Sequence, residues 1–149
     1  MINHGKSDMP PPTGDNLKKI WVPGTWDLFH YGHANLLQRA AFYGEVIVGV
    51  NSDKWVIGTK GKAPVMNELE RLFVVGACEG VKYAYVVPEP LDFRTLKSIV
   101  PDMIVLGSDW KDRDLKGLKE ARQIAEILYF PYVDGISTDE IIKRIGRIT

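Results

Sequence analysis

The sequence predicts an α/β fold, a single Rossmann-like domain with helices on both faces of a parallel sheet. Three observations carry this prediction: apolar runs alternate with amphipathic segments, residues 45–50 are rich in β-branched side chains, and the 149 residues are 45% hydrophobic. Runs of this kind are typical of strands covered on both faces, and strand–helix alternation is typical of parallel sheets. A chain of this length is sufficient for one core.

The first half of the chain is expected to begin with two strands and a helix. Residues 20–23 form a short apolar run, and the amphipathic stretch 32–43 ends at Gly44, a residue type that commonly terminates helices. The run at residues 45–50 predicts the second strand. Glycine, lysine and proline make residues 57–65 an expected loop.

The second half continues the alternation. Asn67 and Glu70 form a capping-box pattern that predicts a helix reaching residue 77, and Ser137 with Glu140 repeats the pattern before the last helix. Further strands are expected at residues 83–87, 103–106 and 127–130, and further helices at 92–99 and 115–126. Ligands of such sheets bind at the carboxyl ends of the strands.

Composition excludes several classes of protein. The formal net charge of +0 and a pI of about 6.8 argue against a broad nucleic-acid or membrane-binding surface. Cys78 alone allows no internal disulfide; we expect a buried thiol and a cytoplasmic location. No apolar run is long enough to span a bilayer. Residues 1–17, which contain three consecutive prolines, are expected to be a flexible leader before a domain at 18–149.

The segment from Gly24 to His33 carries the strongest chemical signal. It places His30 and His33 around Gly32, between a predicted strand and a predicted helix. Helix N-termini collect anions, and two imidazoles can stabilise charge on a phosphoryl group. A histidine that only packs or caps a helix is the simpler alternative, and a metal site is a weaker one because no third ligand lies nearby.

Three further clusters are candidates for the same site, each with a purely structural alternative. The first is a basic loop, Lys60-Gly61-Lys62 with Arg71, which could clamp phosphates or could simply face solvent. The second is a strand end, Gly107-Ser108-Asp109-Trp110, which could contact a base or ribose, or whose tryptophan could be a core residue. The third is a hydroxyl-bearing turn, Gly135-Ile136-Ser137-Thr138, which could bind an anion or could be an ordinary N-cap.

From about residue 18 onward the sequence resembles the cytidylyltransferase-like nucleotidyltransferases, above all the glycerol-3-phosphate cytidylyltransferases. Gly-Thr-Trp-Asp-Leu-Phe-His-Tyr-Gly-His at residues 24–33 matches the family's G-T-F-D-x-x-H-x-G-H signature. Gly-Ile-Ser-Thr at residues 135–138 matches part of the second signature, R-T-E-G-I-S-T-T. No Walker-type or Gly-x-Gly-x-x-Gly phosphate loop and no Gly-x-Ser-x-Gly elbow is present.

The resemblance implies roles for individual residues. It implies catalytic roles for His30, His33, Lys60 and Lys62. It implies nucleotide binding by Thr25, Trp26, Gly32, Arg71, Asp109, Trp110, Gly135, Ile136, Ser137 and Thr138. It implies acceptor binding by Lys60, Asp27 and Arg94. It also implies Mg²⁺ on the triphosphate, no protein-bound metal, and a homodimer.

The expected reaction joins CTP to a phosphorylated alcohol or polyol, releasing pyrophosphate and forming a CDP-alcohol. A departure from the family pattern and a second likeness leave alternatives open. Tyr132-Val133-Asp134 stand where the family has Arg-Thr-Glu, and residues 48–53 and 112–126 look like the heptose-phosphate adenylyltransferases. The alternatives are therefore an adenylyltransferase that uses ATP and a sugar phosphate, and a nucleotide-binding module without catalysis. Asp109-Trp110 and the Gly-Ile-Ser-Thr quartet favour CTP.

Overall fold

A computed structural model describes residues 17–149, so the predicted leader lies outside the described residues except for Leu17. Within this range the chain alternates strands with helices. The strands are β1 (Lys19–Gly24), β2 (Glu45–Asn51), β3 (Val81–Val87), β4 (Met103–Gly107) and β5 (Glu126–Phe130). The helices are α1 (Tyr31–Ala40), α2 (Asp53–Lys60), α3 (Glu68–Gly76), α4 (Phe93–Ile99), a 3-10 turn η1 (Ser108–Trp110), α5 (Leu118–Ile124) and α6 (Thr138–Ile148).

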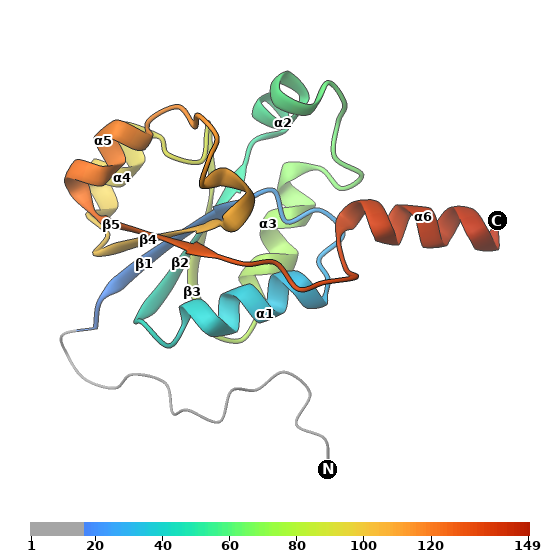
Figure 1. Cartoon of the computed structure of the whole chain (residues 1–149), viewed down its shortest axis with the longest axis horizontal. Coiled ribbons are helices and arrows are strands. Elements are labelled where there is room, and N and C mark those ends of the chain that lie inside the picture. The colour runs from blue at the N-terminus through green and yellow to red at the C-terminus, as the bar shows by residue number, and fades with distance from the viewer. Residues whose placement is uncertain (1–16) are drawn as a thin grey trace, which may run out of the picture.

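All five strands are parallel, in the order β3-β2-β1-β4-β5 (Figure 1). From β1 the chain builds the sheet outward through β2 and β3, and then returns to add β4 and β5 on the other side. The strand order therefore reverses between β1 and β4, which makes their carboxyl ends the topological switch point of the sheet. In open α/β sheets, ligands bind at such a point.

Helices cover both faces of the sheet, as the sequence predicts. One core cluster joins β1 and β2 to α1 and α3, through Leu37, Ala40 and Val75 among others. The second cluster lies on the opposite face, where Leu96 of α4 and Ala121 of α5 pack on Trp21 and Ile104. Burial on both faces explains why β1, β2 and β4 are nearly continuous apolar runs.

Three predicted boundaries are wrong by three residues or more. Residues 57–65 are not all loop, because α2 runs to Lys60: Ser52 caps its start, and Gly61, with φ of 75°, ends it. Helix α1 ends at Ala40 instead of residue 43, and residues 41–43 form a turn before Gly44. Helix α5 begins at Leu118 instead of residue 115, because Gly117 adopts a φ of 87°, which leaves the helical region.

Outside the sheet, two further features are notable. Helix α6 extends beyond the body of the domain (Figure 1). Cys78 is only half-buried, so the expectation of a buried thiol is met in part; burial raises the pKa of this thiol. None of the helices in residues 17–149 is long and apolar enough to cross a membrane.

Candidate active site

The turn between β1 and α1 is held in an unusual backbone conformation. Trp26 and Leu28 have φ angles of 61° and 49°, a left-handed region that side-chain-bearing residues rarely adopt. Trp26 is 2% exposed, and its indole N–H donates to the Gly49 carbonyl at 3.0 Å. Its side chain therefore anchors the turn in the core.

Two histidines and the first turn of α1 hold each other in place. The Gly32 N–H donates to His30 Nδ1 at 3.0 Å, and the His30 N–H donates to His33 Nδ1 at 3.2 Å. An imidazole nitrogen that accepts a hydrogen bond carries no proton. In each neutral ring the proton therefore lies on Nε2, which leaves two N–H donors for a ligand.

Burial keeps both imidazoles uncharged near neutral pH. It lowers the pKa of His30, and for His33 burial together with the charges of His30 and Lys60 lowers the pKa to about 3. The two rings stack with their centroids 3.7 Å apart. Two imidazolium ions at this separation would repel each other, so the pair acts as neutral donors rather than as cations.

The absence of a side chain at Gly32 leaves room for the His30 ring to pack against the start of α1. A Cβ at this position would lie 2.9 Å from His30 Cε1 and 3.4 Å from Ile136 Cγ2. The first distance is shorter than real Cβ contacts, so any larger residue would displace the His30 ring. The second distance shows that the Gly135–Thr138 turn, over 100 positions later, lies against the start of α1.

Asp27 has a structural role in this turn, and its role as an acceptor ligand stays a prediction. It is 7% exposed, and its carboxylate accepts hydrogen bonds from the Val65 and Met66 N–H groups at 2.8 and 2.9 Å. Its carbonyl accepts a hydrogen bond from the Thr138 hydroxyl at 2.8 Å. Asp27 thus ties the loop after α2 and the start of α6 to the histidine turn.

Arg71 is likewise engaged by the protein, and its role in nucleotide binding stays a prediction. Its side chain has no exposed surface. Nη1 donates to the carbonyls of Thr25 and Asn51, and Nη2 pairs with Asp53 at 2.6 Å. Nε donates to the Met66 carbonyl. The guanidinium therefore joins α3 to the residues that follow β1 and end β2, and it holds Thr25 through its carbonyl.

The basic loop begins at the end of α2 and is exposed to solvent. Lys60 is the last residue of α2, and its ammonium is close enough to His33 to lower the pKa of that imidazole. Lys60 and Lys62 are both exposed, on either side of the left-handed Gly61. The charge of Lys60 therefore acts on His33, while Lys62 lies in the adjoining loop.

The strand-end cluster forms a second wall. The Tyr132 ring lies against Gly107, where any Cβ would collide with its hydroxyl. Burial, followed by the hydrogen bond to Asp109 and the charge of that carboxylate, raises the pKa of Tyr132. Trp110 packs on the second core cluster, and the Arg113 guanidinium covers its ring at 4.6 Å. A base could reach this ring only if Arg113 moved.

The remaining predicted residues divide between the site and another surface. Ser137 caps α6 by accepting from the Glu140 N–H, while the Glu140 carboxylate pairs with Arg144 instead of completing the predicted capping box. Gly135, with φ of 79°, forms the turn before it. Arg94 lines a hollow of about 610 Å³ between α4 and β3 whose lining contains neither histidine, and its role as an acceptor ligand stays a prediction.

Sequence reasoning missed the residues that brace the site. Asp53 and Glu68 cap each other's helices: the Asp53 N–H donates to Glu68 Oε1 at 3.0 Å, and the Glu68 N–H donates to Asp53 Oδ2 at 3.2 Å. Asn51, at the end of β2, donates to the Thr25 hydroxyl. Acidic residues at the starts of two consecutive helices are a weak signal that could have suggested this bracket.

Comparison with known proteins supports the family resemblance that the sequence motifs indicate. The cytidylyltransferase-like family model matches residues 21–144, which is most of the chain. The chain belongs to the cytidylyltransferase-like family. The resemblance carried by the two signatures is thereby confirmed.

Relatives with curated names include the bifunctional protein HldE of Helicobacter pylori (strain P12), which is 34% identical over 137 residues. HldE of Aliarcobacter butzleri (strain RM4018) is 32% identical over 130 residues. These matches cover 91% and 86% of this chain but 29% and 27% of the relatives. The chain therefore spans under a third of the length of these relatives.

Two solved structures share the fold. A lipopolysaccharide core biosynthesis protein from Thermoplasma volcanium superposes with a TM-score of 0.67 at 24% identity, covering 80% of this chain and all of that one. Pantothenate synthetase from Thermus thermophilus superposes with a TM-score of 0.53 at 15% identity, covering 85% of this chain and 64% of that one. At these identities the likeness concerns the fold alone.

Proposed function

We propose that this protein is a nucleotidyltransferase that transfers the adenylyl group of ATP to a sugar phosphate, releasing pyrophosphate. The observation that carries the proposal is the histidine pair, with both Nδ1 atoms tied to backbone N–H groups and both Nε2–H donors left for a phosphate. The pair lies at the N-terminus of α1 and at the switch point of the sheet, where anions and nucleotides bind.

The choice of ATP and a sugar phosphate rests on the relatives. The HldE proteins contain a heptose-phosphate adenylyltransferase domain, and the one from Helicobacter pylori (strain P12) matches 91% of this chain at 34% identity. The similarity of residues 48–53 to the same enzymes points in the same direction. These observations favour the adenylyl alternative over the CTP reaction that the signature residues first suggested.

The transfer needs no covalent nucleophile from the protein. A phosphate oxygen of the acceptor attacks the α-phosphorus of the nucleotide in line, a new P–O bond forms, and the bond to pyrophosphate breaks. The Nε2–H groups of His30 and His33 would donate to the oxygens on which negative charge grows. Lys60, beside His33, would neutralise the triphosphate. Positioning and charge stabilisation of this kind are the main sources of catalysis in such transfers.

Mg²⁺ would bind on the phosphates rather than on a protein cage. The described residues contain no cluster of three or more His, Cys, Asp and Glu side chains that could hold a metal ion. Asp27, the carboxylate within the turn, already accepts two backbone hydrogen bonds. This donor set fits an ion that keeps its waters and binds through substrate phosphates, as Mg²⁺ usually does. The ion would supply further charge neutralisation.

The direct test is a matrix of ATP, CTP, GTP and UTP against phosphorylated acceptors, with pyrophosphate release as the readout and Mg²⁺ present. The acceptors should include heptose and hexose phosphates, glycerol 3-phosphate and phosphocholine. We expect release with ATP and a sugar phosphate. Release only with CTP and an alcohol phosphate would overturn the substrate assignment, and ATP binding without release from any pair would overturn the enzymatic one.

A cytidylyltransferase is the second candidate. It is favoured by Gly-Ile-Ser-Thr at residues 135–138 and by Asp109-Trp110, which match the cytidylyltransferase pattern. In this structure, however, Arg113 covers the Trp110 ring and Tyr132 hydrogen-bonds Asp109. The same matrix separates the two candidates, because each nucleotide competes in it directly.

A further inference from the structure

The Tyr132 side chain is fixed at its hydroxyl end and open along its ring. A Cβ on Gly107, the last residue of β4, would collide with this hydroxyl and would lie 2.8 Å from Asp109 Oδ1. Burial, followed by the hydrogen bond that the hydroxyl donates to Asp109, raises the pKa of Tyr132. The residue as a whole is nevertheless 56% exposed, so the exposed part is the ring. A ring held at one end with a bare face is prepared for stacking.

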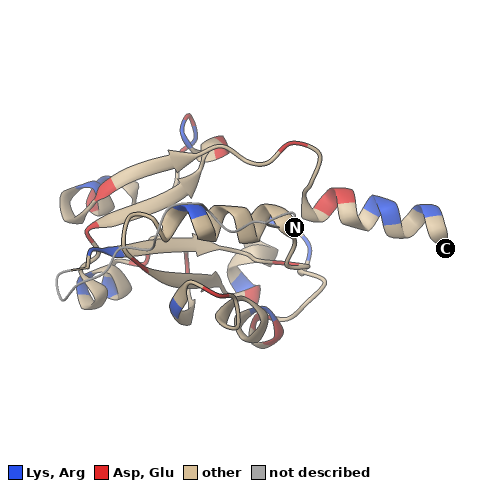
Figure 2. Cartoon of the chain, turned by 90° about the horizontal axis from the view of Figure 1, so that it is seen from below, with Lys and Arg blue, Asp and Glu red and all other residues tan. Residues whose placement is uncertain are grey.

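The helix that follows Tyr132 leaves this ring accessible. Helix α6 begins at Thr138, and it extends beyond the body of the domain in two perpendicular views (Figures 1 and 2). A Cβ on Gly135, in the turn between Tyr132 and α6, would have no atom within 4 Å. The space beside this turn is therefore open to a ligand.

Tyr132 also stands beside the histidine turn. The register of β1 against β4, continued to the strand ends, places Gly107 level with Gly24, the first residue of the histidine segment. Four residues beyond Tyr132, Ile136 lies against Gly32. Four residues span at most about 14 Å. A nucleotide whose phosphates lie on the histidines can therefore bring its base to the Tyr132 ring.

Two other aromatic rings near the site are less suited to a base. Trp110 packs on the second core cluster, and the Arg113 guanidinium covers its ring at 4.6 Å. Tyr31, which is 59% exposed, begins α1, and within residues 17–149 no hydrogen bond holds its side chain. A ring that is already fixed loses less conformational freedom when a ligand binds, which favours Tyr132.

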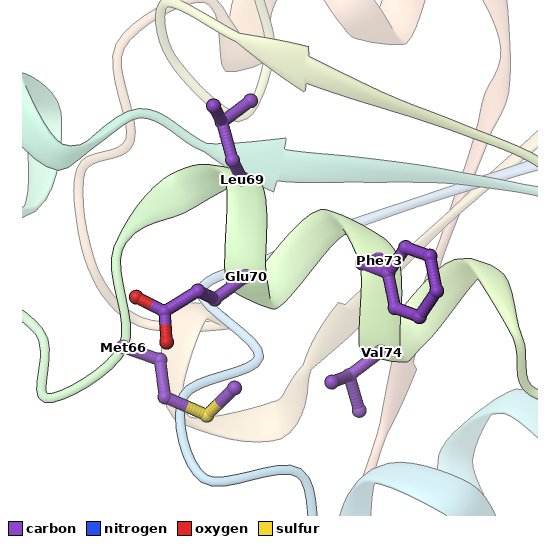
Figure 3. A pocket seen from close by; sticks show the side chains of 5 residues that line it. All are labelled: Met66, Leu69, Glu70, Phe73 and Val74. Atoms are coloured by element: carbon purple, nitrogen blue, oxygen red, sulfur yellow. The ribbon is translucent and has the colours of Figure 1, made fainter.

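Two hollows elsewhere on the surface are also less suited to a nucleotide. The hollow of about 430 Å³ on α3 is apolar apart from one carboxylate, which repels phosphates (Figure 3). It is lined by Met66, Leu69, Glu70, Phe73 and Val74. The α4–β3 hollow contains Tyr83 and Tyr85, but its lining includes neither histidine.

We propose that the nucleotide base stacks on the Tyr132 ring, and that this contact gives the site a preference for purine over pyrimidine triphosphates. A purine has two fused rings, so it covers more of the tyrosine face than a pyrimidine does, and apolar contact grows with the area covered. Stacking recognises the face of a base and not its edge, so Tyr132 favours adenine and guanine alike. The inference rests on the proposed function and adds to it the residue that selects the class of base.

Equilibrium binding without an acceptor measures this preference. Dissociation constants for ATP, GTP and CTP with Mg²⁺ are compared by isothermal titration calorimetry for the wild type and Tyr132→Ala. We expect the wild type to bind ATP and GTP at least about fivefold more tightly than CTP, and Tyr132→Ala to bring all three to within about twofold of each other. Inorganic tripolyphosphate, which has no base, should bind both proteins equally.

Further variants separate stacking from a structural role. Tyr132→Phe keeps the ring and loses only the hydrogen bond to Asp109, so it should retain the preference for ATP over CTP. Tyr31→Ala should also keep the ratio of the ATP and CTP constants. Tyr85→Ala, an exposed tyrosine of β3, should change none of the constants. Circular dichroism checks that each variant folds.

Three results would overturn the inference. They are an unchanged ratio of the ATP and CTP constants in Tyr132→Ala, a ratio that collapses in Tyr31→Ala instead, and weaker binding of tripolyphosphate to Tyr132→Ala, which indicates a general loss of the site. Pyrophosphate release tests the proposed reaction separately. A chain that binds ATP through Tyr132 but releases no pyrophosphate with any acceptor overturns that reaction and supports the stacking role.

Discussion

At the scale of single residues, the proton positions on the two imidazoles follow from two backbone hydrogen bonds. Gly32 N–H occupies Nδ1 of His30, and His30 N–H occupies Nδ1 of His33. The absence of a side chain at Gly32 leaves room for the His30 ring. The backbone of the motif itself therefore occupies both Nδ1 atoms, so that Nε2 of each histidine is left to face a ligand.

Replacing a histidine should separate its catalytic role from its structural one. His33→Asn keeps an acceptor near the Nδ1 position but removes the Nε2–H donor, so we expect turnover to fall by at least ~10²-fold while the fold survives. His30→Ala should lose a similar amount. Pyrophosphate release measures the effect, with exposed Gln123→Ala as the control. Near-normal turnover in both histidine variants would remove these residues from the mechanism.

Stability should depend on pH through His33. Its pKa is about 3 in the folded protein and about 6.5 when unfolded, so the unfolded state binds more protons between these values. The free energy of unfolding should fall by up to about 1.4 kcal/mol per pH unit as the pH drops from 6.5 toward 3. Urea unfolding at several pH values measures this slope. His33→Asn should flatten it, and an unchanged slope in that variant would contradict the assignment.

At the scale of elements, two short helices form a bracket around the basic loop. Asp53 and Glu68 cap each other's helices, and Arg71 ties α3 to the ends of β1 and β2. Asp27 holds the end of the intervening loop. The bracket fixes both ends of the loop while leaving Lys62 exposed, an arrangement suited to a segment that closes on a substrate.

Arg71→Lys should weaken this bracket although it conserves charge. A lysine cannot reach the Thr25, Asn51 and Met66 carbonyls together with Asp53, because it lacks the planar fork of a guanidinium. We expect a loss of about 2–4 kcal/mol in the free energy of unfolding, since buried acceptors lose their donors. Urea unfolding gives the value, and exposed Arg122→Lys should change it by under about 0.5 kcal/mol. Equal stability of both variants would contradict the bracket.

At the scale of the whole molecule, the candidate site is an assembly of segments far apart in the sequence. The histidine turn and the turn before α6 meet at the carboxyl end of β1, and the charge of Lys60 at the end of α2 acts on His33. The Tyr132–Asp109 wall stands beside them. The hollow between α4 and β3, which contains Arg94, is separate from this assembly.

Hydrogen exchange should report this division. Binding of ATP should slow exchange in residues 28–36, 59–66 and 135–141, because these segments surround the phosphates. Residues 81–99, which line the α4–β3 hollow, should exchange at the same rate with and without ATP. Mass spectrometry of peptic fragments measures both sets. Protection of residues 81–99 in place of the first set would move the site to Arg94 and its hollow.

By itself the sequence determined the fold class, the order of the elements other than α2 and η1, and the chemistry-bearing motifs. Alternation of apolar runs with amphipathic segments is a local property, and the capping signal at Asn67 is local too; both are confirmed. The two signatures also identified the family, because their residues are contiguous in the chain. Local patterns failed at α2, where the Ser52 cap and the Gly61 stop outweighed a loop-like composition.

Only the tertiary structure decided what each polar residue does. Asp27, Arg71 and Arg94 look like ligands in the sequence, but the first two satisfy buried backbone groups and the third faces another hollow. A charge reveals its role only through its partners, and the partners of Arg71 lie up to 46 positions away. Burial, which sets the protonation of His33, likewise arises from packing that no local pattern encodes.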